Sequence, residues 1–278
     1  MILLIKNKLY KLNLMKKQKT LVSILIINYN NAKVISRSIL SCLNQSYKRI
    51  EILVFDDQSS DNSKIILNKY LSKKKVSIYF NKEKKKKVAS FDAMNGYNYL
   101  FKKSTGQIIC LLDSDDYFHK NKVKEIVKHF SKNQKSLFVQ NLPKIKINKN
   151  KFLYKKNKNN PLSFWPYLAP ESCISFRKGF MKNFIKDTKY LSNKYSSVWL
   201  GFRLGVYAYF LKKNFANLNK NLTIYESLGE SKKYRFMGKN WIKRRKESFD
   251  YLKNILKKEN YPIYNLDYFA TKLITKII

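Results

Sequence analysis

Two groups of acidic residues in an otherwise basic chain have the types and spacing to bind a ligand. Asp113 and Asp115 lie two residues apart and are followed by Asp116, directly after the apolar run Gln107–Leu112. If the chain turns there, both carboxylates can face one ligand. Oxygen donors with little histidine nearby favour a hard divalent cation, Mn²⁺ or Mg²⁺, bound together with phosphates. The alternative is that Asp115 and Asp116 cap a helix beginning near Lys120.

The second acidic group consists of Asp56 and Asp57 and follows another apolar run, Ile50–Phe55. Asp57 can accept hydrogen bonds from a nucleobase or a ribose, a standard role for an acid after such a strand. The alternative is an Asx turn or an N-cap for a helix near Asn62. Because both acidic groups follow apolar runs, their combination favours a ligand site over helix capping.

The apolar runs that precede these groups are short and rich in β-branched residues, which is typical of strands buried on both faces of a parallel sheet. Residues 22–112 read as four strands connected by three helices, with polar clusters after strands one, two and four. Open parallel sheets bind ligands at this carboxyl edge. We therefore expect an α/β fold with a mostly parallel central sheet flanked by helices. Tyr29, after the first strand, either stacks on a nucleobase or packs half-buried below its turn.

The second half of the chain is less regular. Its expected segments are strands at 137–140, 152–154 and 172–176 and a helix at 198–211. From Asn240 onward the sequence predicts an amphipathic basic helix that carries Trp241. This tail either lies on anionic lipid headgroups or packs back on the domain, and both alternatives stay open.

The charge of the chain is the feature that first suggests a partner. With 58 Lys and Arg against 18 Asp and Glu, the net charge is +40, which favours a nucleic acid or an anionic membrane. A hydrophobic fraction of 44% and an aromatic fraction of 15% exclude a disordered polycation. The lysines are spread along the whole chain without any nucleic-acid-binding signature, so we expect no specific nucleic-acid partner.

The cysteines and the hydropathy bear on the compartment. Cys42, Cys110 and Cys173 are odd in number and far apart, without a CxxC pair, which favours a reducing compartment. No run of 18 uncharged apolar residues is present, so a membrane-spanning helix is not expected. The sequence therefore predicts a cytoplasmic protein, either soluble or peripheral at the inner face of the membrane.

Three segments, taken in order, resemble the family 2 glycosyltransferases. They are Val22–Asn30, Glu51–Asp61 and Gly106–Asp116, the last with the DxD pattern Asp113-Ser114-Asp115. The resemblance implies the GT-A fold and the transfer of a sugar from a nucleotide diphosphate donor to a glycan or lipid-linked acceptor in cell-surface polysaccharide synthesis, with an inverting outcome.

The resemblance also implies a domain plan and a set of site residues. A GT-A domain over 20–215 would lie between a basic N-terminal extension at 1–19 and a basic C-terminal helical extension at 216–278. Asp113 and Asp115 would hold a divalent cation, Mn²⁺ or Mg²⁺, that neutralises the leaving nucleotide diphosphate. The nucleotide-sugar-binding residues would be Tyr29, Asp57, Lys87, Asn98 and Asp113.

The chain departs from the family pattern on the acceptor side. Inverting members carry an acidic pair just before a Trp and an Arg, which this chain keeps within Val198–Arg203, but Ser196 and Ser197 occupy the acidic positions. Serine cannot serve as the base that deprotonates the acceptor, and the nearby acids Glu171 and Asp187 belong to no motif. The catalytic residue is therefore unassigned. A donor-binding protein without turnover and a basic polyanion-binding module remain the alternatives.

Overall fold

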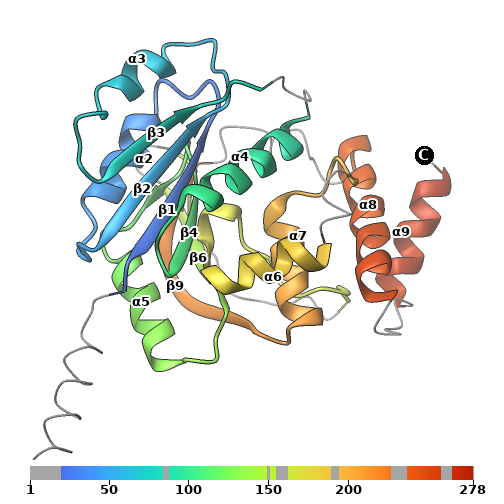
Figure 1. Ribbon diagram of the computed structural model, residues 1–278. Coiled ribbons are helices and arrows are strands. Elements are labelled where there is room, and N and C mark those ends of the chain that lie inside the picture. The colour runs from blue at the N-terminus through green and yellow to red at the C-terminus, as the bar shows by residue number, and fades with distance from the viewer. Residues whose placement is uncertain are drawn as a thin grey trace, which may run out of the picture.

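The computed structural model describes residues 20–83, 88–148, 151–154, 162–188, 194–226, 237–257 and 265–277 of the chain (Figure 1). The predicted N-terminal extension at 1–19 and the predicted phosphate contact Lys87 lie outside the described residues.

A central sheet in the order β3-β2-β1-β4-β8-β6-β9-β5, with β7 paired to β6, forms the middle layer. The strands are β1 (Val22–Asn28), β2 (Ile50–Asp56), β3 (Val76–Phe80), β4 (Ile108–Asp113), β5 (Tyr117–Phe118), β6 (Phe138–Lys146), β7 (Phe152–Tyr154), β8 (Ile174–Arg177) and β9 (Phe215–Tyr225). Strands β1 to β4 pair in parallel, which confirms the predicted parallel sheet for the first half. Strand β8 runs antiparallel to both β4 and β6, so the complete sheet is mixed.

Helices cover both faces of this sheet (Figure 1). The α-helices of the described residues are α2 (Ile35–Leu43), α3 (Ser63–Asn68), α4 (Ala89–Lys103), α5 (Lys122–Lys132), α6 (Lys178–Thr188), α7 (Leu200–Val206), α8 (Lys239–Leu256) and α9 (Leu266–Ile277). Successive residues of β1 point to opposite faces. Leu25 and Ile27 pack with α4, α6 and α7, whereas Ile24 and Ile26 pack with α2, α3 and α5. The sheet is therefore buried on both sides, as its apolar strands require.

The two C-terminal helices form a third cluster beside the sheet (Figure 1). Phe249 and Leu252 of α8 are buried against Phe210 of the preceding helical segment. Helix α9 packs on α8, and Arg245 of α8 forms an ion pair with Asp267 of α9. Helix α8 thus packs back on the domain, the arrangement that was one of the two alternatives for the tail.

Strand β9 lies across the predicted border between residues 215 and 216. It pairs in parallel with β6 and antiparallel with β5, so residues up to Tyr225 belong to the central sheet. Its sequence, Phe215–Tyr225, is rich in Asn, a residue depleted in strands, and therefore reads as a loop. Pairing with the distant strand β6 overrides this local preference.

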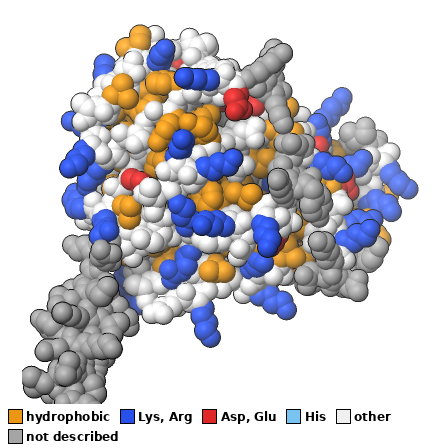
Figure 2. Space-filling view, in the orientation of Figure 1, with side chains coloured by type: hydrophobic (Ala, Val, Ile, Leu, Met, Phe, Trp, Pro, Cys, Tyr) orange, Lys and Arg blue, Asp and Glu red, His pale blue; other side chains and the backbone are white. Residues whose placement is uncertain are grey.

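The surface charge is spread over the molecule. On the face drawn in Figure 2, Lys and Arg side chains are scattered between apolar and polar ones and do not gather in one patch. Among the helices that the structure describes, none has the length and hydropathy needed to cross a membrane.

Candidate functional site

The two acidic groups lie at the same edge of the sheet, as expected. In the parallel register Asn28 of β1 pairs with Asp56 of β2, and Ile27 pairs with Asp113 of β4. The loops that leave β1, β2 and β4 therefore emerge side by side. This shared carboxyl edge is where an open parallel sheet binds its ligands.

Asp56 holds two of these loops together. Its Oδ1 accepts hydrogen bonds from Asn28 Nδ2 at 2.7 Å and from Ser59 Oγ at 2.7 Å, and its Oδ2 accepts one from the Ser59 backbone N–H at 3.1 Å. A different acid, Asp61, lies just before helix α3, and its Oδ1 accepts a hydrogen bond from the Ser63 N–H at 3.0 Å. The local turn roles are thus taken by Asp56 and Asp61.

Asp57 is buried near Asp56, and its carboxylate is oriented by Asn81, the residue just after β3. Only 4% of Asp57 is exposed, and its Oδ1 accepts a hydrogen bond from Asn81 Nδ2 at 2.7 Å. Its backbone N–H donates to the Asn28 carbonyl at 2.8 Å, which holds the residue at the end of β1. Asn81 is a partner that the sequence patterns did not single out.

Tyr29 projects from the loop after β1, with 52% of the residue exposed. The next residue, Asn30, has a positive φ of 51°, a conformation that Asn tolerates better than most residues. Its side-chain Oδ1 accepts from the Ser60 N–H at 2.8 Å, and its own N–H donates to Ser59 Oγ at 2.9 Å. About half of Tyr29 is thus open to a ligand at this edge, and stacking on a nucleobase stays a prediction.

Asp113 ends β4 inside a crowd of carboxylates. Its Oδ1 accepts a hydrogen bond from Tyr97 Oη of α4 at 2.8 Å. Burial of the carboxyl, together with the nearby negative charges of Glu171, Asp116 and Asp115, holds the pKa of Asp113 well above its usual range. A cation at this point would relieve that repulsion, so the donor chemistry fits a divalent ion.

Asp116 ties the acidic turn to the rest of the sheet. It is fully buried, and its Oδ1 accepts from the backbone N–H of Glu226, just after β9, at 3.0 Å. Burial, and next the charge of Asp115, raise the pKa of Asp116 to about 8. Arg37 of α2 donates to the Asp115 carbonyl at 2.8 Å. The N-cap of α5 is Asn121, so Asp115 and Asp116 do not take the capping role that was the alternative to a ligand site.

Helix α4 reaches the acidic turn through Tyr97, the neighbour of the predicted contact Asn98. Asn98 is half-buried, and its Oδ1 is enclosed without a hydrogen-bond partner among the described residues. The sequence analysis did not select Tyr97, but it did select the next residue, Asn98, on the helix that precedes the strand with the DxD pattern.

The metal-ligand set is small. In the ranges that the structure describes, no three His, Cys, Asp or Glu side chains converge closely enough to hold a metal ion on their own. A cation at the Asp113–Asp115 turn would therefore need further oxygen ligands from a bound molecule. Phosphate oxygens are the usual ones for Mg²⁺.

The serines at the expected acidic positions lie against a carboxylate from α8. Glu247 Oε2 accepts a hydrogen bond from the Ser197 backbone N–H at 2.7 Å, and Glu247 Oε1 accepts one from Ser196 Oγ at 3.5 Å. Arg203 is 1% exposed and holds this loop by donating to the carbonyls of Val198 at 2.9 Å and Tyr195 at 3.1 Å. Sequence reasoning missed Glu247 because it lies 50 residues beyond Ser197.

The two acids considered from the sequence have separate partners. Glu171 Oε1 accepts from the Gly201 N–H at 2.9 Å, and burial raises the pKa of Glu171. Gly201 permits this approach, because a Cβ there would lie 3.1 Å from Glu171 Cδ. Asp187 accepts from Tyr207 Oη and forms an ion pair with Lys212 at 3.0 Å, and these contacts lower the pKa of Asp187.

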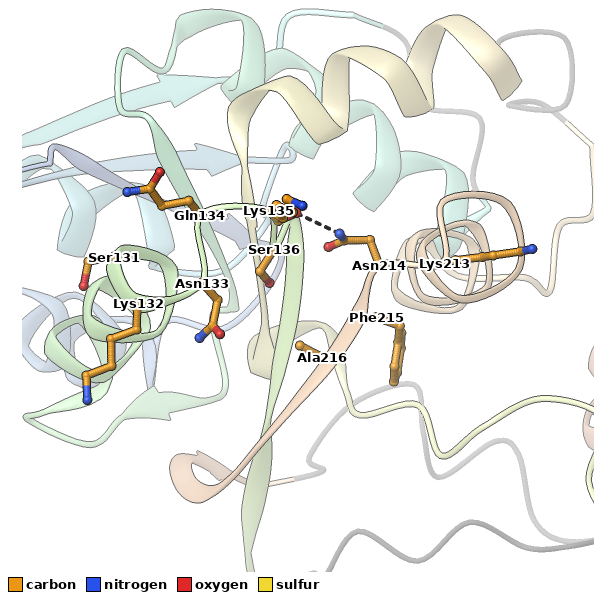
Figure 3. A pocket seen from close by; sticks show the side chains of 10 residues that line it. All are labelled: Ser131, Lys132, Asn133, Gln134, Lys135, Ser136, Lys213, Asn214, Phe215 and Ala216. Atoms are coloured by element: carbon orange, nitrogen blue, oxygen red, sulfur yellow. Dashed lines mark hydrogen bonds between the residues drawn. The ribbon is translucent and has the colours of Figure 1, made fainter.

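A surface pocket lies away from the acidic edge. Figure 3 shows it between residues 131–136 and residues 213–216, where the Lys135 carbonyl accepts from Asn214 Nδ2 at 2.8 Å. Strands β6 and β9 begin here and run parallel to β4, so their starts lie at the amino edge of the sheet. The pocket is therefore separate from the candidate site.

Sequence comparison gives relatives of one kind. The sequence model described as glycosyl transferase family 2 matches residues 23–218. An uncharacterized glycosyltransferase of Haemophilus influenzae is 36% identical over 106 residues, 38% of this chain and 40% of the relative. The UDP-Glc:alpha-D-GlcNAc-diphosphoundecaprenol beta-1,3-glucosyltransferase WfaP of Escherichia coli is 36% identical over 118 residues, 42% of this chain and 44% of the relative. The chain thus matches less than half the length of these two relatives.

Solved structures share the fold at low identity. S. aureus TarS 1-349 has a TM-score of 0.58 at 16% identity, covering 84% of this chain and 66% of that one. The mannosyltransferase PcManGT of Pyrobaculum calidifontis, solved with GDP-Man and Mn²⁺, has a TM-score of 0.54 at 12% identity, covering 94% and 74%. The architecture is therefore the GT-A fold. With the family model matching most of its length, the chain belongs to glycosyl transferase family 2.

Proposed function

We propose that this protein transfers a sugar from a nucleotide diphosphate donor to a glycan or lipid-linked acceptor in cell-surface polysaccharide synthesis, with a divalent cation and inversion at the anomeric carbon. The observation that carries the proposal is the meeting of the Asp57 and Asp113 loops at the carboxyl edge of the sheet, in a chain of family 2. The name of the E. coli relative, which gives UDP-Glc as donor and a diphosphoundecaprenol-linked acceptor, supports the substrate classes.

The nucleoside would bind at the ends of β1 and β2. The exposed ring of Tyr29 would stack on the base, and the Asp57 carboxylate, oriented by Asn81, would accept hydrogen bonds from the base or ribose. Structures of TarS with UDP and with UDP-GlcNAc support a uridine donor. Asn98 of α4 would offer its enclosed Oδ1 to the ligand, and Lys87 would meet the phosphates.

The diphosphate would bind at the end of β4. Asp113, held by Tyr97, and Asp115 would supply the cation ligands, since their crowding with Glu171 and Asp116 favours a positive charge at this turn. The bound cation, Mn²⁺ or Mg²⁺, would neutralise the leaving nucleotide diphosphate. Asp113 and Asp115 would in this way also orient the diphosphate of the donor.

Isothermal calorimetry with UDP-Glc, UDP-GlcNAc and GDP-Man, with and without Mn²⁺, tests this proposal. We expect binding that depends on Mn²⁺ and that weakens by about tenfold or more, about 1.4 kcal/mol, in Asp115→Ala. Glu125→Gln is the matched control, because this acid lies on α5 and pairs with Lys220 at 2.6 Å. Binding that is indifferent to both Mn²⁺ and Asp115→Ala would contradict the metal assignment, and no binding of any donor would contradict the function.

An exposed face of α9 supports contact with an anionic membrane at the cytoplasmic face, where a lipid-linked acceptor would be presented. Leu266, Phe269 and Leu273 follow one another at helical spacing and are 75%, 54% and 62% exposed. Thr271, by contrast, is buried toward α8 and bonded to Arg245 at 3.0 Å. Apolar residues on one face of a basic amphipathic helix are typical of helices that lie in the headgroup region.

A further inference from the structure

Transfer to a hydroxyl acceptor requires a group that takes its proton. The nucleophilic oxygen is a weak nucleophile until the proton leaves, and a positioned carboxylate is a usual acceptor for it. In this chain the residues at the expected acidic positions are Ser196 and Ser197, which lack a carboxylate. The question for the site is therefore which other carboxylate lies there. The inference that follows rests on the proposed transferase function.

The loop that carries Ser196 and Ser197 contacts the start of α4 and leads into α7. The Ser196 carbonyl accepts a hydrogen bond from Ser90 Oγ, at the start of α4. The same loop leads into α7, where the Gly201 N–H donates to Glu171 at 2.9 Å. Glu171 in turn lies close enough to Asp113 to raise the pKa of that carboxyl. The loop is thus connected to the acidic turn through Gly201 and Glu171.

Helix α8 delivers a carboxylate to this loop. Glu247 binds the Ser197 N–H at 2.7 Å and Ser196 Oγ at 3.5 Å, forms an ion pair with Lys243 of the same helix at 3.9 Å, and keeps 18% of its side-chain surface exposed. Arg244, one turn earlier on α8, lies near enough to Glu171 to act against the rise of its pKa. Residues three apart on a helix share a face, so the face of α8 that holds Glu247 is turned toward the site.

The other carboxylates near the loop are less suited to the role. Asp187 accepts a hydrogen bond from Tyr207 Oη and forms an ion pair with Lys212 at 3.0 Å, and these contacts lower the pKa of Asp187, which makes it a weaker base. Glu171 accepts a hydrogen bond from the Gly201 N–H at 2.9 Å, on α7 and not at the two serines. Glu247 is bonded to the Ser197 N–H, at the loop itself.

We infer that Glu247 of α8 is the catalytic base, taking the place of the acid that is missing at Ser196 and Ser197. As the acceptor oxygen forms its bond to the anomeric carbon, its proton passes to the Glu247 carboxylate. The bond from the anomeric carbon to the diphosphate oxygen breaks, and its electron pair leaves with the nucleotide diphosphate. The Ser197 N–H and Ser196 hydroxyl orient the carboxylate.

Glu247→Gln tests the assignment, because the amide keeps the shape and an acceptor oxygen for the Ser197 N–H but cannot take a proton. The measurement is steady-state release of UDP from UDP-Glc and UDP-GlcNAc with Mn²⁺, with water as the acceptor, beside donor affinity by calorimetry. We expect a fall in kcat of about 10²–10⁴-fold with donor affinity and melting temperature unchanged. Asp250→Asn, an exposed acid on the same helix, is the matched control and should keep full activity.

Rescue separates a base from a structural contact. Placing a carboxylate back on the loop in Ser197→Asp/Glu247→Gln should recover about tenfold or more of the lost kcat. Wild-type turnover in Glu247→Gln, an equal loss of donor affinity, or no recovery in the double variant would each overturn the assignment. A wild-type protein that binds donor but releases no UDP would instead contradict the proposed transferase function, and the base with it.

Discussion

At the scale of single residues, the partner of each edge carboxylate determines its task. Asp56 and Asp116 accept hydrogen bonds from the protein's own loops and hold them in place. Asp57 accepts a hydrogen bond from Asn81 and Asp113 accepts one from Tyr97, and these contacts orient the two carboxylates at the carboxyl edge of the sheet. The sequence showed the acids as two groups but not this division of labour, because it depends on contacts between different loops.

Tyr97→Phe measures how much the orientation of Asp113 by Tyr97 contributes to the affinity for the nucleotide-sugar donor. Burial, together with Asp113, raises the pKa of Tyr97, so its hydroxyl remains a donor. Removing a hydrogen bond to a carboxylate costs about 1.5–3 kcal/mol, so we expect the affinity for the nucleotide sugar to fall about tenfold or more. Calorimetry with Mn²⁺ and UDP-Glc checks it. Tyr99→Phe, two residues on and 40% exposed, is the control; equal affinities in both variants would show that Tyr97 does not orient Asp113.

At the scale of elements, the sequence predicted segments whose burial is decided locally. Strand β3 (Val76–Phe80) and helix α4 (Ala89–Lys103) are among the four strands and three helices expected over residues 22–112, because apolar runs and helical spacing are properties of the segments themselves. Strand β9 and the contact of Glu247 with Ser197 were not foreseen. Both arise from pairing between parts of the chain far apart in sequence, which local periodicity does not record.

The loop before α7 depends on one buried cation. Arg203 donates to the carbonyls of Lys194, Tyr195 and Val198 and lies 5.2 Å from the Tyr251 ring centre. Arg203→Leu removes the donor of the buried Val198 carbonyl, at a cost of about 1–3 kcal/mol, together with two partly buried hydrogen bonds, so we expect the free energy of unfolding to fall by about 2 kcal/mol or more.

Urea unfolding followed by circular dichroism measures that change. Arg49→Leu replaces an exposed arginine and should alter the free energy of unfolding by less than about 0.5 kcal/mol. If Arg203→Leu were as stable as Arg49→Leu, the guanidinium would not be what holds the Ser196–Ser197 loop.

At the scale of the whole molecule, the net charge of +40 marks no particular contact surface, whereas the exposed apolar face of α9 does. We expect Phe269→Asp/Leu273→Asp to abolish co-sedimentation with vesicles that contain phosphatidylglycerol, because each inserted side chain contributes about 1.5–3 kcal/mol. Ile65→Asp, on α3 and 63% exposed, is the matched control. Equal binding by the double variant and the control would exclude α9 as the contact.

The hydrogen bond from the Glu226 N–H to Asp116 has a consequence for where this protein can be divided. The stretch matched by the family ends at residue 218, inside β9, whereas the acidic turn is anchored from residue 226. A chain cut at the family border would lose most of an inner strand and the anchor of its own acidic turn. The smallest piece able to keep the edge intact therefore extends through β9 to Glu226, beyond the stretch by which the family is recognised.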